Sequence, residues 1–357
     1  MRLHVSRLGV RALALGMVGT ALAAGCQKSP APEPSPPASS PPPPPAGPTA
    51  AGAPKNAARP MPERLVAIGD LHGDLEAARR ALRLAGAIDA KDAWIGGKLV
   101  VVQTGDEIDR GDDDRAVLDL FERLKEEAPK AGGEVIALVG NHEIMNAMFD
   151  FRYVTPGSYG AFADQTASTG RIKEAIASVE PSAKPRAAAF APGGRYAAML
   201  AKRPAIARVG DTIFVHGGVL PKHVSAGLDD INAKAKEWLL GTAPEGPPPR
   251  ALTSEDGPLW TRMYSAAPGR EECAMLGETL AALGAKRMVM GHTPQRNGAN
   301  AACEGKAWRI DVGMAKAFES NRIEVLELTG DAAKVLAETR DAAPDAGARP
   351  VDPPRTR

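Results

Sequence analysis

The chain has 357 residues, of which 44% are hydrophobic and 24% are charged, so it is long enough to bury a sizeable core. Its formal net charge of +1 lacks the excess of basic residues typical of nucleic-acid binding, and three cysteines are too few for a dense disulfide scaffold or a zinc ribbon. We therefore expect one large globular unit or two small ones, and no nucleic-acid partner.

The N-terminal segment has the pattern of an export signal. Three arginines precede an apolar run, residues 12–24, which ends in the small residues of "LAAGC", residues 22–26. This ending resembles a bacterial lipobox, which implies cleavage before Cys26 and lipidation of that residue. Residues 1–26 are thus expected to be a lipoprotein signal peptide that exports the protein to the cell envelope, periplasm or outer membrane, with the lipid as its only membrane contact. The alternative is an ordinary export signal without lipidation.

The next segment, residues 27–60, has the composition of a spacer. It consists almost entirely of Pro, Ala, Ser and Gly, and residues 41–45 are five consecutive prolines. Without apolar periodicity such a segment cannot form a packed core, so it is expected to be a disordered linker. Residues 341–357 have a similar composition and are expected to be a disordered tail. Residues 61–340 remain as the folded domain.

Short apolar runs within this domain predict β-strands. They occupy residues 64–69, 98–105, 134–140, 212–218, 287–291, 307–313 and 322–328. Because helical patterns separate several of these runs, the sequence predicts an α/β fold.

Helical periodicity is clearest in two stretches, residues 116–124 and residues 276–283. A further helix is expected to start at Leu75, with Asp74 as its N-terminal cap. Residues 147–204 are less regular, and we expect them to be a cap or a substrate-facing insertion.

Five of the predicted strands end in the same way, with an apolar run followed by glycine or histidine and further polar residues. The motifs are GDLHGD (residues 69–74), GDEIDRG (105–111), GNHE (140–143), HGG (216–218) and GHTPQ (291–295), and they contain four of the six histidines. Strand ends in α/β sheets are where functional sites are assembled, and glycine lets the backbone turn sharply there. Each motif alone also fits a turn or a helix cap, but their combination favours a shared site.

The side chains in these motifs form a candidate metal-ligand set without a thiolate. The set is Asp70, His72, Asp106, Asn141, His216 and His292. Carboxylate, imidazole and amide ligands suit Mn, Fe or Zn. Six ligands are enough for two divalent ions about 3.5–4 Å apart that share one carboxylate and activate a bridging water, which becomes hydroxide near neutral pH.

The ordered motifs GDxHG, GDxxDRG, GNHE, HGG and GHTP resemble those of the calcineurin-like metallophosphoesterase superfamily, in particular its phosphoprotein phosphatase branch. The resemblance implies a two-sheet β-sandwich flanked by helices, with a dinuclear metal site at the strand ends. It assigns Asp70 and His72 to the first metal, Asp106 to the bridge, and Asn141, His216 and His292 to the second metal. It also implies that His142 is the general acid, that Asp109 orients it and that Arg110 clamps the phosphoryl oxygens.

A further stretch narrows the resemblance. The segment DGPLWTRMY (residues 256–264), together with GHTPQ and RIDVGM (residues 309–314), resembles the bacterial-type phosphatases called Shewanella-like or Rhizobiales-like. This resemblance implies that Arg262 is a second phosphate contact. From the residues alone, Arg110 and Arg262 could equally be held in ion pairs.

These patterns predict an exported metal-dependent phosphatase that hydrolyses phosphomonoesters, with a phosphorylated peptide or a small ester as its partner. Mn is the preferred metal, with Fe or Zn as alternatives. The preference for phosphotyrosine or for phosphoserine and phosphothreonine stays open, as does the oligomeric state. A nucleotide or dinucleotide-polyphosphate hydrolase and a non-catalytic envelope lipoprotein are the alternative functions.

Two further expectations concern residues outside the motifs. Because cysteines of exported proteins often pair, Cys273 and Cys303 are expected to form a disulfide, with two buried free thiols as the alternative. His223 is expected at the surface, with a position that lines the site as the alternative.

Overall fold

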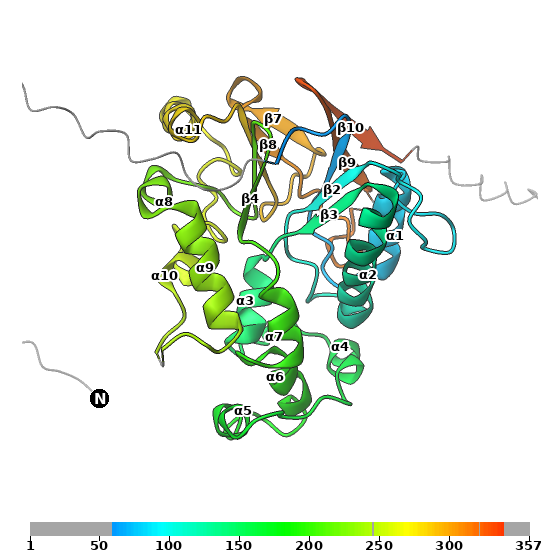
Figure 1. Cartoon of the computed structure of the whole chain (residues 1–357), viewed down its shortest axis with the longest axis vertical. Coiled ribbons are helices and arrows are strands. Elements are labelled where there is room, and N and C mark those ends of the chain that lie inside the picture. The colour runs from blue at the N-terminus through cyan, green and yellow to red at the C-terminus, as the bar shows by residue number, and fades with distance from the viewer. Residues whose placement is uncertain (1–58, 245, 321, 339–357) are drawn as a thin grey trace, which may run out of the picture. The chain divides into compact units, whose positions relative to one another are not determined.

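The computed structural model describes residues 59–244, 246–320 and 322–338. The predicted signal peptide with Cys26, nearly all of the predicted linker and the predicted tail lie outside the described residues. The described strands form two five-stranded sheets (Figure 1). None of the described helices is long and apolar enough to cross a bilayer.

The first sheet has the strand order β10-β9-β1-β2-β3. Its strands are β1 (Leu65–Ile68), β2 (Val100–Gln103), β3 (Glu134–Ala137), β9 (Glu324–Thr329) and β10 (Ala332–Ala337). Strands β1, β2 and β3 run parallel, whereas β9 is antiparallel to both β1 and β10. The carboxyl ends of β1, β2 and β3 therefore meet at one edge of the sheet.

The second sheet has the order β4-β5-β6-β8-β7. Its strands are β4 (Ile206–Val209), β5 (Thr212–Val215), β6 (Arg287–Met290), β7 (Asn300–Ala302) and β8 (Ala307–Arg309). Strands β5, β6 and β8 run parallel, and the two edge strands are antiparallel to their neighbours. This sheet also gathers the carboxyl ends of three strands at one edge.

The central core lies between the two sheets. Ala67 and Val102 of the first sheet pack in one cluster with Phe214 and Val289 of the second. Alternate residues such as Ile68 point the other way, into a second cluster under helices α1 (Leu75–Leu84) and α2 (Asp114–Glu127). Both faces of these strands are buried, which explains why they are continuous apolar runs in the sequence.

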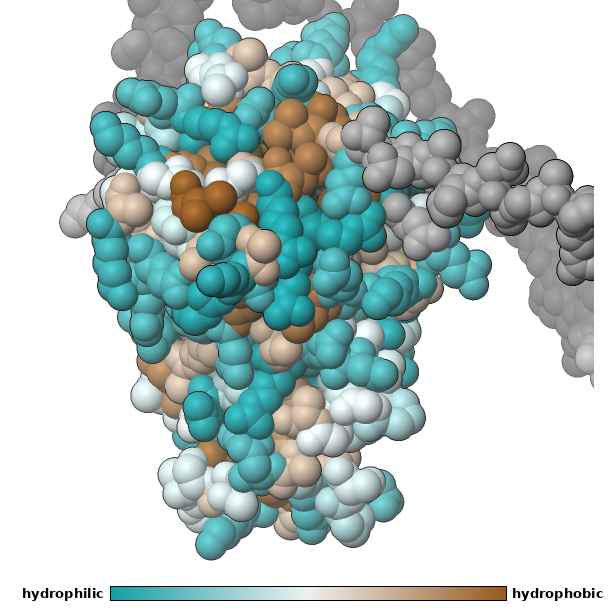
Figure 2. Space-filling model, turned by 90° about the vertical axis from the view of Figure 1, so that its right-hand side faces the viewer, coloured by the Kyte–Doolittle hydropathy of each residue, from teal (hydrophilic) through white to brown (hydrophobic). Residues whose placement is uncertain are grey.

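Helices cover the outer face of each sheet (Figure 1). One core cluster joins strands of the second sheet to residues of α3 (Asn141–Ala147), α6 (Lys184–Phe190), α7 (Arg195–Leu200), α8 (Pro221–Ala226), α9 (Leu228–Leu239), α10 (Arg250–Thr253) and α11 (Arg270–Leu283). The remaining helices are α4 (Pro156–Ala161) and α5 (Gly170–Ala175), and short 3-10 turns span Ala128–Ala131, Cys303–Gly305 and Lys316–Phe318. On the side of the molecule that carries α1 and α2, hydrophobic residues form separate patches within a mostly hydrophilic surface, as expected above amphipathic helices (Figure 2).

The predicted fold class, two sheets flanked by helices, is confirmed, and all seven predicted strands are present in shortened form. The expected cap of α1 is also present, because the Asp74 side chain accepts a hydrogen bond from the Ala77 N–H at 3.0 Å. Strands β4, β7 and β10 were not predicted. A disulfide joins Cys273 of α11 to Cys303 after β7, with Cα atoms 5.1 Å apart.

Candidate active site

The six predicted metal ligands all lie at the gathered strand ends. Asp70 and His72 follow β1, Asp106 follows β2, Asn141 begins α3 just after β3, His216 follows β5 and His292 follows β6. Every one of these side chains is buried, with at most 7% of its surface exposed. The fold therefore brings together residues that are up to 222 positions apart in the sequence.

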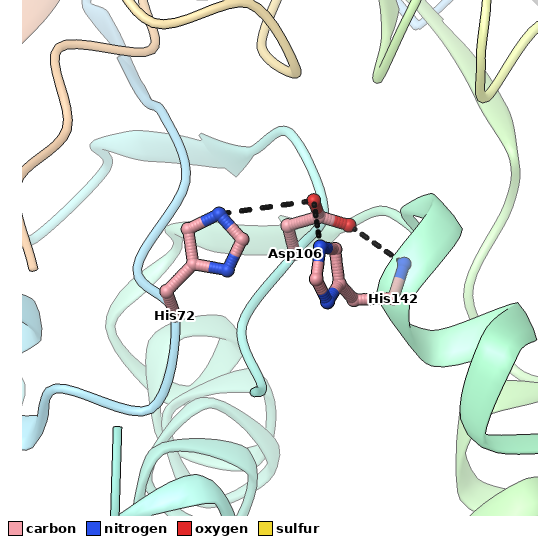
Figure 3. A group of neighbouring side chains, drawn as sticks. All are labelled: His72, Asp106 and His142. Carbon is pink, nitrogen blue, oxygen red and sulfur yellow. Dashed lines mark hydrogen bonds and ion pairs between the residues drawn. The ribbon is translucent and has the colours of Figure 1, made fainter. Parts of the chain in front are cut away.

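Asp106 lies at the centre of this group. Its Oδ2 atom is 3.9 Å from His72 Nε2, 3.8 Å from His142 Nε2 and 3.2 Å from His216 Nε2. Figure 3 shows the Asp106 carboxylate between the rings of His72 and His142. The candidate ligand atoms form two groups, His72–Asp106–His142 and Asp106–His216–His292, each with its atoms within 4.8 Å of one another. Asp106 is common to both groups, as expected of a bridging ligand.

Two glycines let the backbone approach the carboxylates closely. A Cβ atom on Gly140 would lie 2.2 Å from Asp106 Oδ1, and one on Gly291 would lie 2.2 Å from Asp70 Oδ1. Residues shortly after these glycines bind the carboxylates, because the His142 N–H donates to Asp106 Oδ1 and the His292 N–H donates to Asp70 Oδ2, both at 3.0 Å. The glycines of GNHE and GHTPQ are therefore required by close packing as well as by the turn.

The site also holds much of the left-handed backbone of the described chain. The non-glycine residues with positive φ include His72 (45°), Asp106 (56°), Asp109 (70°), Arg110 (68°) and His292 (66°). Such conformations cost energy and persist where surrounding contacts fix them, commonly at functional sites. The strained turns aim these five side chains.

Glu143 joins the two loops that carry Asp106 and Asn141. Its carboxylate accepts hydrogen bonds from the backbone N–H groups of Gly140 at 2.7 Å, Asp106 at 3.0 Å and Glu107 at 2.9 Å. It is fully buried. Glu143 thus fixes the backbone beside the predicted ligands Asp106 and Asn141, which accounts for the glutamate of the GNHE motif.

The charges of the site suit cations. Burial raises the pKa of Asp70, and the carboxylates of Asp311 and Asp106 raise it further. Among the described residues, neither Asp70 nor Asp106 forms an ion pair with a lysine or arginine. Burial also lowers the pKa of His72 to about 3 and that of His292 to about 2, so both imidazoles are neutral near pH 7. Buried carboxylates without a lysine or arginine partner, beside two neutral imidazoles, are a donor set that fits divalent metal ions.

His142 and Asp109 form a hydrogen-bonded pair beside the metal ligands. His142 Nδ1 lies 2.7 Å from Asp109 Oδ2, so the other ring nitrogen, Nε2, is free of this bond. Burial alone would lower the pKa of His142, but the Asp106 carboxylate and the Asp109 hydrogen bond outweigh burial and raise it. The pair has the geometry of a proton donor oriented by a carboxylate.

A cavity of about 270 Å³ opens next to this pair. Its lining includes His72, Asp106, Asn141, His142, His292, Arg110 and Arg262, together with the aromatic rings of Tyr153, Trp260 and Phe318. Four of the six predicted metal ligands, the predicted acid and both predicted phosphate contacts therefore border one space, whereas Asp70 and His216 do not line it.

Comparison with known proteins agrees with this geometry. A family model described as calcineurin-like phosphoesterase matches residues 63–296. The chain belongs to this family. It is 40% identical over 297 residues to Shewanella-like protein phosphatase 2 of Arabidopsis thaliana, an alignment that covers 76% of each protein. It is also 30% identical over 259 residues to Shewanella-like protein phosphatase 1 of Plasmodium berghei, covering 71% of this chain and 67% of the relative.

The solved structures show the same fold. A cold-active protein-tyrosine phosphatase of a psychrophilic Shewanella species matches with a TM-score of 0.60 at 24% identity, covering 78% of this chain and 82% of the other. The predicted superfamily and Shewanella-like type are confirmed, and this phosphoesterase is a hydrolase with phosphatase relatives.

The two predicted phosphate contacts of the phosphoesterase are held differently. The Arg110 guanidinium lies over the ring of Tyr153, 4.3 Å from its centroid, and its buried Nε atom has no hydrogen-bond partner among the described residues. Arg262 Nη1 donates to the His292 carbonyl oxygen at 2.6 Å and to Thr293 Oγ1 at 3.0 Å. Neither arginine forms an ion pair within the described residues, so both retain donors for an anion.

Sequence reasoning missed Asp311, which follows β8 beside the ligand strands. It is 1% exposed; its Oδ1 accepts from the Gly313 N–H at 2.9 Å, and its Oδ2 has no partner among the described residues. Burial raises the pKa of Asp311 to about 6. The sequence could have indicated this residue. RIDVGM, like the five strands that end in the motifs, is an apolar run followed by a polar residue and glycine.

The expected surface position of His223 was wrong. This side chain is 4% exposed, and its Nδ1 accepts a hydrogen bond from the Leu220 N–H at 3.0 Å. Burial, helped by the nearby Lys222, lowers the pKa of His223 to about 4. His223 is thus a neutral buried cap of α8 and does not line the cavity.

Proposed function

We propose that this protein is an exported metal-dependent phosphatase that hydrolyses phosphomonoesters, including phosphorylated peptides. The observation that carries the proposal is the hydrogen-bonded Asp109–His142 pair, whose histidine borders one cavity with two arginines and with Asp106. The relatives named as protein phosphatases support the same reaction class.

The chain's own residues account for substrate binding and for the departure of the leaving group. Arg110 and Arg262 bind the phosphoryl oxygens, whose negative charge persists in the transition state. His142 Nε2 gives its proton to the ester oxygen as the P–O bond breaks, while Asp109 holds the Nδ1 proton and stabilises the ring. Two divalent cations, Mn by preference and Fe or Zn as alternatives, would supply an activated water and neutralise phosphoryl charge when bound by the six ligands.

The walls of the cavity favour an aromatic leaving group. Tyr153, Trp260 and Phe318 border the space around Arg110 and His142, and flat rings pack well against such side chains. We therefore place phosphotyrosine peptides ahead of phosphoserine peptides as substrates.

A substrate panel tests the proposal. Protein stripped with a chelator and reloaded with Mn, Fe or Zn would be assayed with phosphotyrosine peptide, phosphoserine peptide, p-nitrophenyl phosphate, bis-p-nitrophenyl phosphate and diadenosine tetraphosphate. Preference for the monoesters supports the proposal. Preference for the diester or the dinucleotide rejects it in favour of the alternative polyphosphate hydrolase, and no turnover by fully loaded protein favours the non-catalytic envelope lipoprotein.

The proposed location rests on the sequence of residues 1–26 alone. Mass spectrometry of the N-terminus and cell fractionation, each compared with a Cys26→Ser variant, test it. We expect a lipidated Cys26 in the wild-type membrane fraction and a variant that lacks the lipid. An intact N-terminus on protein in the cytosol would overturn both export and anchoring.

A further inference from the structure

A buried arginine lies behind the acid pair. Arg186 comes from α6, within the segment expected to be a cap, and its side chain is fully buried. Its Nη2 donates to Asp109 Oδ1 at 3.1 Å and to Asp114 Oδ2 at 2.6 Å. Its Nε donates to Asn146 Oδ1 and its Nη1 to Ser158 Oγ, both at 2.7 Å. Every nitrogen of the guanidinium is therefore committed to a contact.

The two carboxylate oxygens of Asp109 have separate partners. Oδ2 faces His142 Nδ1, whereas Oδ1 accepts from Arg186 and, at 2.9 Å, from Asn146 Nδ2. The Asn146 amide also donates to the His142 carbonyl oxygen at 2.9 Å. The carboxylate cannot rotate toward or away from the His142 ring without losing at least one of these bonds.

Arg186 also supplies the charge that this buried region needs. Asp109 and Asp114 are both fully buried, and their ion pairs among the described residues are with Arg186 and, for Asp109, with His142. The rings of Phe162 and Phe190 lie 5.0 and 5.1 Å from the guanidinium and shield it. Buried carboxylates without a cation are strongly unfavourable. Loss of Arg186 would therefore force Asp109 and Asp114 to rearrange.

We propose that Arg186 is a positioning residue for the general acid: it fixes the Asp109 carboxylate, which in turn fixes the His142 ring against the leaving oxygen. This inference rests on the proposed phosphatase function. None of the hydrogen bonds or ion pairs of Arg186 involves a predicted metal ligand. Its influence is therefore on proton donation and separate from metal binding.

Proton donation matters most when the leaving group is basic. The p-nitrophenolate anion is stable and departs without a proton, whereas phenolate and an alkoxide depart poorly unless protonated. A misplaced His142 ring therefore reduces turnover of phenyl phosphate and phosphoserine peptide more than turnover of p-nitrophenyl phosphate. A general loss of folding reduces all three equally.

The test compares Arg186→Gln and Arg186→Lys with Arg203→Gln in the full chain, each loaded with Mn. Arg203 is a matched control, because it is a buried arginine of the same segment that pairs with Glu107 and Glu122 and does not touch the acid pair. We expect Arg186→Gln to lower kcat for phenyl phosphate roughly tenfold or more beyond its effect on p-nitrophenyl phosphate, with unchanged metal stoichiometry. Arg186→Lys should recover part of the loss, and Arg203→Gln should leave the ratio of the two rates at its wild-type value.

A double variant tests whether Arg186 acts through His142. If Arg186 acts through His142, then Arg186→Gln added to His142→Ala changes the rate ratio no further. In protein loaded with diamagnetic Zn in place of Mn, the NMR signal of the His142 Nδ1 proton should also shift or disappear in Arg186→Gln. Equal losses on all substrates, loss of metal, or a further change in the His142→Ala background would each overturn the inference.

Two additional outcomes are informative. If Arg186→Gln does not fold, Arg186→Lys and Asn146→Ala, which removes a second contact to Asp109 Oδ1, provide the same comparison. Failure of the wild-type protein to hydrolyse any phosphomonoester would reject the proposed function itself. Normal wild-type activity with an unchanged rate ratio in the Arg186 variants would reject only this inference.

Discussion

Replacing Glu143 by Gln should destabilise the metal-free protein by about 2 kcal/mol. The carboxylate accepts three buried backbone N–H groups, but the single carbonyl oxygen of Gln can take the place of only one carboxylate oxygen. At least one N–H then faces an amide donor, which costs about 1–3 kcal/mol, and the remaining bonds lose their charge assistance. Burial and the Asp106 carboxylate raise the pKa of Glu143, so removing its charge relieves some repulsion and offsets part of the loss.

Urea unfolding of chelator-stripped protein at pH 8, followed by tryptophan fluorescence, measures this change. Glu126→Gln, at an exposed position of α2, is the matched control and should stay within about 0.5 kcal/mol of the wild type. Because Glu143 holds the backbone of Asp106, metal affinity should also fall by roughly 10- to 100-fold, although Glu143 is not a predicted ligand. A Glu143→Gln variant as stable as the control would refute the reasoning.

Three further predictions concern the acid, a buried histidine and the disulfide. His142→Ala should lower turnover by roughly 10²- to 10⁴-fold at normal metal content, whereas Asp106→Asn should also lower the amount of bound metal. Elemental analysis measures the bound metal, and equal metal loss in both variants would contradict the role of His142 as the acid. The folded-state pKa of His223 is about 4, below its ordinary value of 6.5, so the stabilising effect of the neutral ring is complete above pH 6.5 and is lost as the pH falls to 4. Wild type should therefore lose up to about 3 kcal/mol more than His223→Gln over this range, and parallel denaturation curves would disprove it. Replacing Cys273 and Cys303 by Ser should lower the free energy of unfolding by about 3–4 kcal/mol, and a thermal midpoint equal to the wild type would argue against that contribution.

The candidate site could be predicted because its residues lie in local patterns. Each predicted ligand follows an apolar strand and a sharp turn, and parallel strands bring such ends to one edge whatever the length of chain between them. The helix cap at Asp74 was predictable for the same reason, because it depends only on neighbouring residues of the chain. Asp311 carried the same signal but was given no role. Strands β7 and β10 were missed because β7 has only three residues and the largely solvent-facing β10 is rich in alanine, so neither has a clear apolar run.

The buried arginines were beyond the reach of sequence patterns. Arginine is normally exposed, and only the assembled fold shows that Arg186 and Arg203 meet buried carboxylates of the GDEIDRG loop and α2. The predicted surface position of His223 was wrong for the same reason. The sequence of a short helix does not show which segments will cover its polar residues. Such burial depends on contacts between distant segments, so it produces no periodic pattern in the local sequence.

The stretch of chain between α3 and β4 has consequences for redesign of this enzyme. It contributes Tyr153 to the cavity wall and, 33 positions later, Arg186 to the region behind Asp109. A loop graft at Tyr153 must therefore retain α6, or it will also disturb Asp109 and, through it, the proposed general acid His142. Under the proposed function, one exchangeable segment would affect both selectivity and proton transfer, and variants that alter only the part before α4 offer the cleaner route to new specificity.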